Sequence, residues 1–208
     1  MKQGANRYEP IARWLGITLT PQQRALLSRY EEWLADEAMA AGGIGPHEEF
    51  RLFDRHVADS LAYCKGLPET IETIADIGGG VGLPSIPMAV AFPDTAFTLV
   101  DRSERRTRLA RRAVRILGLE NLVVTTTDVS RVTDTFDVVT FRASVPVGRA
   151  AALTLKLTSP GGLGLFGVSR LRDRPKIPGP PDGIAFSLSS EGSEVLDSPF
   201  WLLRMYRI

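Results

Sequence analysis

The sequence predicts an α/β fold with a mostly parallel, doubly wound sheet, an antiparallel edge and an N-terminal helical cap. Apolar residues recur at three- and four-residue spacings between residues 8 and 65, as on amphipathic helices. From Ile71 onward, short apolar runs alternate with helical patterns, which is typical of parallel strands joined by crossover helices. We therefore expect a cap at 1–70 and a main domain at 71–208, packed as one compact unit.

The predicted cap contains two amphipathic stretches. Thr20-Pro21 is a helix start signal, and apolar residues follow it at helical spacing. The glycine-rich run at 40–46 ends this first helix. A second apolar stripe runs from Phe53 to Cys64 and predicts another helix.

The main domain is expected to contain five parallel strands, followed by an antiparallel pair. Prolines crowd the segment from Asp173 to Gly183, so neither a helix nor a central strand can pass through it, and we expect a loop. The alternating runs 184–188 and 201–206 then predict the antiparallel edge. The parallel strands are expected near 73–77, 96–100, 122–126, 136–141 and 163–168, and the helices between them near 84–92, 104–117 and 147–158.

The composition is that of a soluble globular protein. The chain has 25 Lys and Arg against 24 Asp and Glu, a net charge of +1, which argues against a uniformly basic surface but allows one basic face. The single Cys64 cannot form an internal disulfide. Neither a signal-peptide pattern nor an apolar run of about 18 residues is evident. We expect a cytoplasmic monomer that uses no metal and no membrane.

The main chemical signal is the run DIGGGVG at 76–82, between a predicted strand and a predicted helix. Gly78, Gly80 and Gly82 allow a tight turn and let a ligand approach the free N–H groups at the helix start. A dinucleotide fingerprint would need glycine at position 83, where the chain has Leu83. The spacing therefore favours S-adenosylmethionine over NAD. The Asp76 carboxylate is expected to balance the positive charge of that ligand.

Two further carboxylates follow predicted strands. Asp101 ends the second strand, 19 residues after Gly82, near the spacing at which a carboxylate meets ribose hydroxyls. Asp128 follows the third strand, where it could accept from the adenine amino group. Parallel strands end at one edge of the sheet, so these groups are expected to converge on one crevice. The alternative is that the glycines only connect strand to helix and that the carboxylates cap helices.

Several motifs resemble one bacterial family. The chain is similar, over about residues 20 to 145, to the methyltransferases that make 7-methylguanine in small-subunit ribosomal RNA, also called glucose-inhibited division protein B. The resemblance implies a Rossmann-like S-adenosylmethionine-dependent methyltransferase fold, with ribosomal RNA or the small ribosomal subunit as partner. The motifs are His-x-x-Asp-Ser at 56–60, Gly-Leu-Pro-x-Ile-Pro at 82–87, the Asp101 region with its arginines, Gly-Leu-Glu-Asn at 118–121 and Phe-Arg-Ala at 141–143.

The resemblance also implies roles for particular residues. His56 and Asp59 would lie beside the catalytic cleft. Because guanine N7 needs no general base, we expect Arg142 to orient the acceptor or its phosphate. The alternatives are a structural ion pair for Arg142 and packing for His56. Asp59 could instead orient His56 or cap the backbone. The residues implied to lie against the cofactor are Gly78, Leu83, Asp128, Val129, Ser130 and Arg142.

The chain departs from the family pattern where an acceptor would bind. The run at 40–45 stands in place of an Asn-Leu-Thr sequence, Asp128 stands in place of an arginine, and Phe166-Gly167 replaces a Lys-Gly pair. Three functions therefore stay open: an RNA guanine methyltransferase, a methyltransferase for another acceptor such as a small molecule, and a nicotinamide-dependent oxidoreductase or a cofactor-binding relic.

The predicted helix at 104–117 and the residues just before it are rich in arginine. Seven arginines occupy 102–115, and apolar residues mark the opposite, inward stripe. Such a face could attract RNA phosphates, and Arg102, Arg105 and Arg106 are the candidate RNA-binding residues. A merely solvated helix exterior is the alternative.

Overall fold

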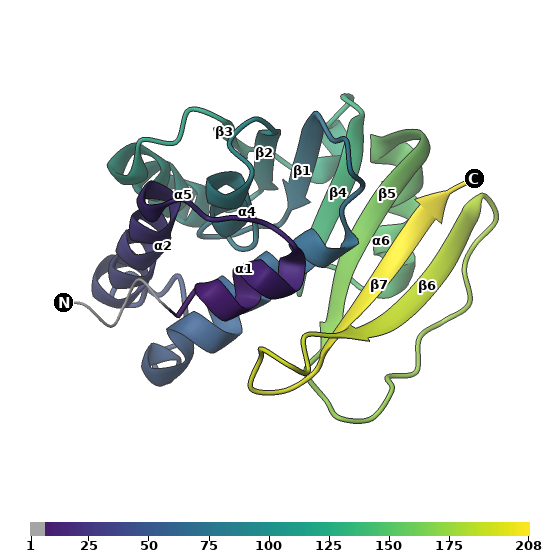
Figure 1. The fold of residues 1–208 in the computed structure, drawn as a ribbon. Helices are drawn as coiled ribbons and strands as arrows, with labels where there is room; N and C mark the ends of the chain where they lie inside the picture. The colour runs from purple at the N-terminus through teal and green to yellow at the C-terminus, as the bar shows by residue number, and fades with distance from the viewer. Residues whose placement is uncertain (1–6) are drawn as a thin grey trace.

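The computed structural model describes residues 7–208, so the first six residues of the predicted cap lie outside the described residues. One seven-stranded sheet runs through the molecule in the order β3-β2-β1-β4-β5-β7-β6 (Figure 1). The first five strands are parallel, and β7 is antiparallel to both β5 and β6. The strands are β1 (Thr73–Ile77), β2 (Ala96–Asp101), β3 (Leu122–Thr126), β4 (Phe136–Arg142), β5 (Thr158–Ser169), β6 (Ile184–Glu191) and β7 (Phe200–Arg207).

This arrangement confirms the predicted sheet, including its antiparallel edge. The chain runs outward from β1 to β3 and then returns to place β4 on the other side of β1. The connections therefore leave β1 and β4 in opposite directions, which opens a crevice beyond their carboxyl ends. The largest departure from the expected bounds is β5, which begins at Thr158 rather than near residue 163.

Helices cover both faces of the sheet, as a doubly wound fold requires. Alternate residues of a strand point to opposite faces, and β1 shows this clearly. Ile74 belongs to the core shared with the N-terminal helices, α4 (Ser85–Ala91) and α5 (Glu104–Leu117). Ala75 and Ile77 belong to a second core, which α6 (Val147–Leu157) covers from the other side (Figure 1).

The N-terminal helices share the first of these cores with the sheet. Helix α2 begins with a capping box, in which the Thr20 hydroxyl accepts from the Gln23 N–H and the Gln23 side chain accepts from the Thr20 N–H. In the described part of the cap, the helices contribute side chains to the same core cluster as the sheet. Its helices are α1 (Glu9–Leu15), α2 (Pro21–Trp33), η1 (Leu34–Ala38), η2 (Glu49–Arg51), η3 (Leu52–Ala58), α3 (Asp59–Ala62) and η4 (Tyr63–Gly66).

The second predicted helix of the cap is irregular. Residues 49–66 are helical throughout, but η2 and η4 are 3₁₀ turns and η3 is π-helical. The π-helical segment carries His56. Such wide turns are rare and are often found at functional sites.

Tyr63 fastens this helical segment to the sheet. Its fully buried hydroxyl donates to the Phe141 carbonyl at 2.9 Å and accepts from the Gly167 N–H at 3.1 Å. Burial is the main cause that raises the pKa of Tyr63 far above its usual value, so the phenol stays protonated. One hydroxyl therefore ties η4 to the ends of both β4 and β5.

We predict that Tyr63→Phe lowers the free energy of unfolding by about 1 to 3 kcal/mol, because it leaves two polar backbone groups without a partner. Denaturant titration followed by circular dichroism measures this change. The matched control is Tyr206→Phe, at a position 42% exposed, which is expected to change stability by less than about 0.5 kcal/mol. Equal free energies of unfolding for the two variants would show that the Tyr63 hydrogen bonds contribute nothing to stability.

Candidate functional site

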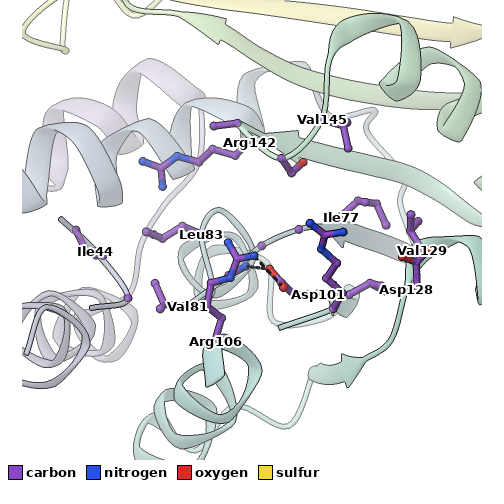
Figure 2. Close-up of a pocket in the computed structure, with 18 of the residues that line it drawn as sticks. Ile44, Ile77, Val81, Leu83, Asp101, Arg106, Asp128, Val129, Arg142 and Val145 are labelled. Carbon is purple, nitrogen blue, oxygen red and sulfur yellow. Dashed lines mark hydrogen bonds and ion pairs between the residues drawn. The ribbon is translucent and has the colours of Figure 1, made fainter. Parts of the chain in front are cut away.

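A cavity of about 630 Å³ lies at the carboxyl ends of β1, β2 and β4 (Figure 2). Its wall includes Gly78, Gly80, Asp101, Asp128 and Arg142, which come from four separate segments. Of the three carboxylates expected to converge on one crevice, Asp101 and Asp128 lie in this wall, and their contacts with a ligand stay a prediction. Asp128 and Val129 lie at one end of the cavity, and Ile44 and Leu83 lie at the other (Figure 2).

The glycine turn forms the floor of this cavity. Gly78, Gly80 and Gly82 have φ values of 77°, 60° and 109°, which favour glycine. A Cβ on Gly78 would overlap the Ser144 side chain, so the turn after β1 and the loop after β4 meet at closest approach here. At Gly80 the nearest atom to an added Cβ is the Arg106 Cδ, 3.7 Å away, so this part of the backbone is open toward the cavity.

Asp76 lies behind the turn rather than in the cavity wall, which corrects its expected contact with a ligand. It is 1% exposed, and its carboxylate accepts from the Ser85 N–H at 3.1 Å and from the Thr140 hydroxyl at 3.2 Å. Burial raises the pKa of Asp76 to about 6, and these hydrogen bonds oppose the rise. Asp76 therefore braces the turn from below. Gly82 likewise lies outside the wall and packs against Ile86.

Asp101 lies in the wall but already has partners in its own chain. Its carboxylate accepts from the Gly80 N–H at 3.1 Å and from the Ser103 N–H at 2.8 Å, and it pairs with Arg106 at 3.3 Å. Two carboxylate oxygens offer about four acceptor positions, so capacity remains for further donors. The Arg106 side chain, which is 42% exposed, covers that carboxylate from the solvent side.

The segment after β3 forms one end of the cavity. Asp128 and Val129 line it, whereas Ser130 lies outside the wall. The Asp128 carboxylate accepts from the Ser130 N–H at 2.8 Å, and hydrogen bonding to Ser130 is the largest cause that lowers the pKa of Asp128. Lys156 holds the same segment by donating to the Val129 and Ser130 carbonyls. The proposed helix-capping role of Asp128 and its place in the wall are therefore both observed.

The two residues of the His-x-x-Asp-Ser motif lie in different surroundings. His56 lines the cavity beside Arg142, with the Arg142 Nη2 3.0 Å from its Nδ1. Asp59 lies outside the wall and pairs with Arg170 at 3.2 Å. Burial raises the pKa of Asp59 to about 6, with Arg170 as the main opposing influence. His56 therefore lies at the cavity, whereas Asp59 lies outside its wall in a buried ion pair, and a catalytic role for either residue stays a prediction.

The arginine-rich face is largely paired within the chain. Arg105 donates to the Ala41 carbonyl, Arg106 pairs with Asp101, and Arg112 pairs with Glu37. Of the three predicted RNA-binding residues, only the Arg102 side chain has neither an ion pair nor a hydrogen bond among the described residues, because Arg106 pairs with Asp101 and Arg105 donates to backbone carbonyls. Arg102 lines the cavity, as does Arg149 on α6, which sequence reasoning missed and which also forms no ion pair within residues 7–208.

Two further loops belong to the wall. Gly43 to Gly45 line the cavity, and the sequence marked this run as a helix break and as the replacement for the Asn-Leu-Thr sequence of the family pattern. The loop 143–146 lines it as well, and its first residue, Ala143, has a φ of 48°. A left-handed alanine costs of order 1 kcal/mol or more and is commonly held at functional sites. Glycines in the first loop were a usable signal, whereas in the second loop only Ala143 belonged to a recognised motif and nothing marked residues 144–146.

One protein family matches most of this chain. A family model described as rRNA small subunit methyltransferase G matches residues 23–167. Relatives named ribosomal RNA small subunit methyltransferase G include one from Acidothermus cellulolyticus, 38% identical over 66% of this chain and 62% of the relative. Another, from Corynebacterium efficiens, is 34% identical over 86% of this chain and 81% of the relative. The chain thus spans less than two thirds of the length of the first relative but most of the second.

Solved structures of methyltransferases share the fold. A precorrin-6y C5,15-methyltransferase from Geobacter metallireducens superposes with a TM-score of 0.53 at 12% identity, covering 72% of this chain and 88% of that chain. A SAM dependent methyltransferase from Aquifex aeolicus gives 0.51 at 14% identity, covering 88% and 98%. These likenesses confirm the predicted fold class. Within residues 7–208, no helix is long and apolar enough to cross a membrane.

We predict that Gly78→Ala destabilises the protein by about 2 to 4 kcal/mol, because the new methyl group meets Ser144 and the backbone must keep a left-handed conformation. Thermal unfolding checks this value. The control is Gly148→Ala on α6, where an added Cβ has nothing within 4 Å and alanine favours the helix, so stability should be unchanged or rise by up to about 1 kcal/mol. A Gly78 variant as stable as the control would refute the close approach of the two loops.

Proposed function

The chain belongs to the rRNA small subunit methyltransferase G family, and on this premise we propose that it transfers a methyl group from S-adenosylmethionine to N7 of a guanine in small-subunit ribosomal RNA. The observation that carries the proposal is the cavity where Gly80, Asp101 and Arg142 meet in a chain of this family. Bound S-adenosylmethionine would supply an activated methyl group. The chain's own task is then to align an acceptor lone pair and to exclude water.

The cavity residues fit this cofactor. Gly80 leaves its backbone open to the cavity, and the adjacent Asp101 retains acceptor capacity for ribose hydroxyls. Asp128 and Val129 would meet the adenine, with Asp128 as an acceptor for its amino group and Val129 against the ring. In this order the adenosine would lie at the Asp128 end of the cavity and the methyl group toward Arg142 (Figure 2), beside which His56 lies. Arg106 must swing away from Asp101 for the ribose to bind, which its exposure permits.

Charge at the rim favours an acceptor that carries phosphates. Arg102 and Arg149 line the cavity, and both act on Asp128 to lower its pKa. Neither is held by a carboxylate within the described residues, unlike Arg106 and Arg112. Guanidinium groups of this kind bind phosphate oxygens with good geometry. We assign to Arg102 and Arg149 the contacts with phosphates beside the target nucleotide. As ribosomes are cytoplasmic, this function implies a cytoplasmic protein.

A second acceptor class is favoured by one observation. The loop Gly43 to Gly45 lines the cavity where the family pattern has Asn-Leu-Thr, so a base-contacting amide is replaced by backbone and the Ile44 side chain. A methyltransferase for a small or non-ribosomal acceptor would have the same cofactor half of the cavity and a different acceptor half. Cofactor binding therefore cannot distinguish the two acceptor classes, and the acceptor needs an experiment of its own.

For the cofactor, calorimetric titration is expected to show binding of S-adenosylmethionine and none of NAD. Asp101→Ala should weaken binding by about 1 to 3 kcal/mol, because buried hydrogen bonds to the ribose are lost. The control is Glu104→Ala, an exposed acidic residue three positions away whose loss should leave the affinity unchanged. Binding of NAD alone would overturn the cofactor assignment, and an unchanged affinity in the Asp101 variant would remove that residue from the site.

For the acceptor, modified guanines are mapped in small-subunit RNA from cells with and without the gene. One 7-methylguanine is expected to disappear with the gene and to return when purified protein and S-adenosylmethionine are added to the unmodified subunits. An unchanged guanine pattern in both assays rejects ribosomal RNA and favours the second acceptor class.

The same subunits test the rim arginines. Arg102→Gln and Arg149→Gln should each raise the KM for subunits and reduce its salt dependence, with a slope change of about 1 per arginine, while the affinity for cofactor stays constant. Arg108→Gln is the control, because Arg108 lies on the exposed face of α5, pairs with Glu104 and does not line the cavity. Equal effects of all three changes would indicate a diffuse basic surface instead.

A further inference from the structure

Three cavity residues, two from the N-terminal part of the chain and one from the end of β4, form a hydrogen-bonded series. The Arg142 Nη2 at the end of β4 donates to the Arg55 carbonyl at 2.6 Å and lies 3.0 Å from the His56 Nδ1. The other ring nitrogen of His56, Nε2, lies 3.2 Å from the Glu48 carboxylate. Glu48, His56 and Arg142 all line the cavity.

The chemistry of arginine fixes the direction of this series. A guanidinium has only donors, so the His56 Nδ1 must accept from Arg142. The ring proton therefore resides on Nε2, from which it is donated to the Glu48 carboxylate. In the reverse tautomer, the N–H on Nδ1 would point at the guanidinium, and the Glu48 carboxylate would have no donor from the ring.

We propose that Glu48 is a positioning residue, which acts through a neutral His56 to hold the Arg142 guanidinium toward the methyl acceptor. The acceptor group that fits Arg142 is an oxygen with lone pairs, such as a base carbonyl or a phosphate oxygen. His56 is a spacer in this arrangement, not a proton carrier. The inference deepens the proposed function and rests on it for the identity of the acceptor.

The surroundings of His56 keep it neutral. Its side chain is 12% exposed, and burial is the largest cause that lowers the pKa of His56, to about 4. The charges that face it are Arg142 and Arg51, which lower the pKa, and Glu48, which raises it. Because this value lies below the ordinary 6.5, the ring stays uncharged near neutral pH and keeps its acceptor toward Arg142.

A neutral histidine orients the Arg142 guanidinium without occupying it, whereas a direct carboxylate partner would occupy it. Arg106 in the same cavity pairs directly with Asp101, so a carboxylate occupies its guanidinium. Arg142 is instead held through one nitrogen by His56 and a backbone carbonyl, which fixes its direction while the side chain still lines the cavity. A guanidinium held in this way loses little further freedom when an acceptor oxygen binds.

The tautomer can be measured on the whole protein without any ligand. The chain has two histidines, so His47→Gln leaves His56 as the only imidazole for ¹⁵N NMR. The expected spectrum is that of a neutral ring with its proton on Nε2, unchanged from pH 8 to about pH 5.5. Protonation near pH 6.5, or a proton on Nδ1, would overturn the proposal whatever the protein methylates. In Glu48→Ala the Nε2 proton loses its acceptor, and a spectrum with unaltered Nε2 shifts would also overturn it.

Methyl-transfer kinetics on unmodified small subunits test the positioning role. His56→Leu and Glu48→Ala should lower kcat by about tenfold to a hundredfold, because Arg142 loses its orientation, while the cofactor Kd changes by less than about twofold. His56→Gln and Glu48→Gln retain the hydrogen-bonding groups and should recover most of that loss.

Glu49→Ala is the matched control, because Glu49 is the neighbouring exposed carboxylate and forms no ion pair within residues 7–208, and its kcat should be that of the unaltered protein. A loss that the glutamine variants fail to recover, or a change confined to the cofactor Kd, would refute positioning. Were the unaltered protein to leave the subunits unmethylated, the proposed acceptor would fail while the NMR result still decided the Glu48–His56–Arg142 series.

Discussion

The closest approach of two loops at the ends of β1 and β4 determines the shape of the cavity. The glycine turn after β1 meets the loop 143–146 where Gly78 faces Ser144, and no side chain larger than a hydrogen atom fits at that point. The left-handed Ala143 turns the chain immediately after Arg142. Both conformations cost free energy, of order 1 kcal/mol or more for the alanine. The packed strands on either side offset that cost, and Asp76 holds the turn from beneath through Ser85 and Thr140.

Pairing within the chain decides which arginines remain available to a ligand. Arg106 pairs with Asp101, Arg112 pairs with Glu37, and Arg105 donates to backbone carbonyls. Net charge cannot reveal this, because a chain with a charge of +1 can hold its cations in ion pairs or display them. Within the described residues the contrast at the cavity is between Arg106, which has a carboxylate partner, and Arg102 and Arg149, which have none. The electrostatic character of the site is therefore a property of the tertiary structure.

Local patterns predicted the sheet well because each strand and helix carries its own signal. The alternation after Ile71, the prolines before Gly183 and the glycine spacing are all short-range features, and the strands and the cavity floor follow from them. The roles of charged residues depend on partners far away in the chain. Asp76 meets Thr140 across 64 positions, and Arg112 meets Glu37 across 75, so no local pattern could assign them. Arg149 was missed for the same reason, since only the return of the chain through β4 and α6 brings it to the cavity rim.

The histidine and the aspartate of the His-x-x-Asp-Ser motif lie in different surroundings and have different roles. His56 lines the cavity, while Asp59 reaches Arg170 just beyond the end of β5, and Arg170 and Arg55 both pair with Asp197. Burial raises the pKa of Asp59 to about 6, so forming this charged network costs desolvation that its Coulomb attraction only partly returns. The network therefore contributes more to the placement of its residues than to the stability of the fold. The network fixes Arg55, whose carbonyl accepts from Arg142, and thus links the C-terminal strands to the direction of the cavity arginine.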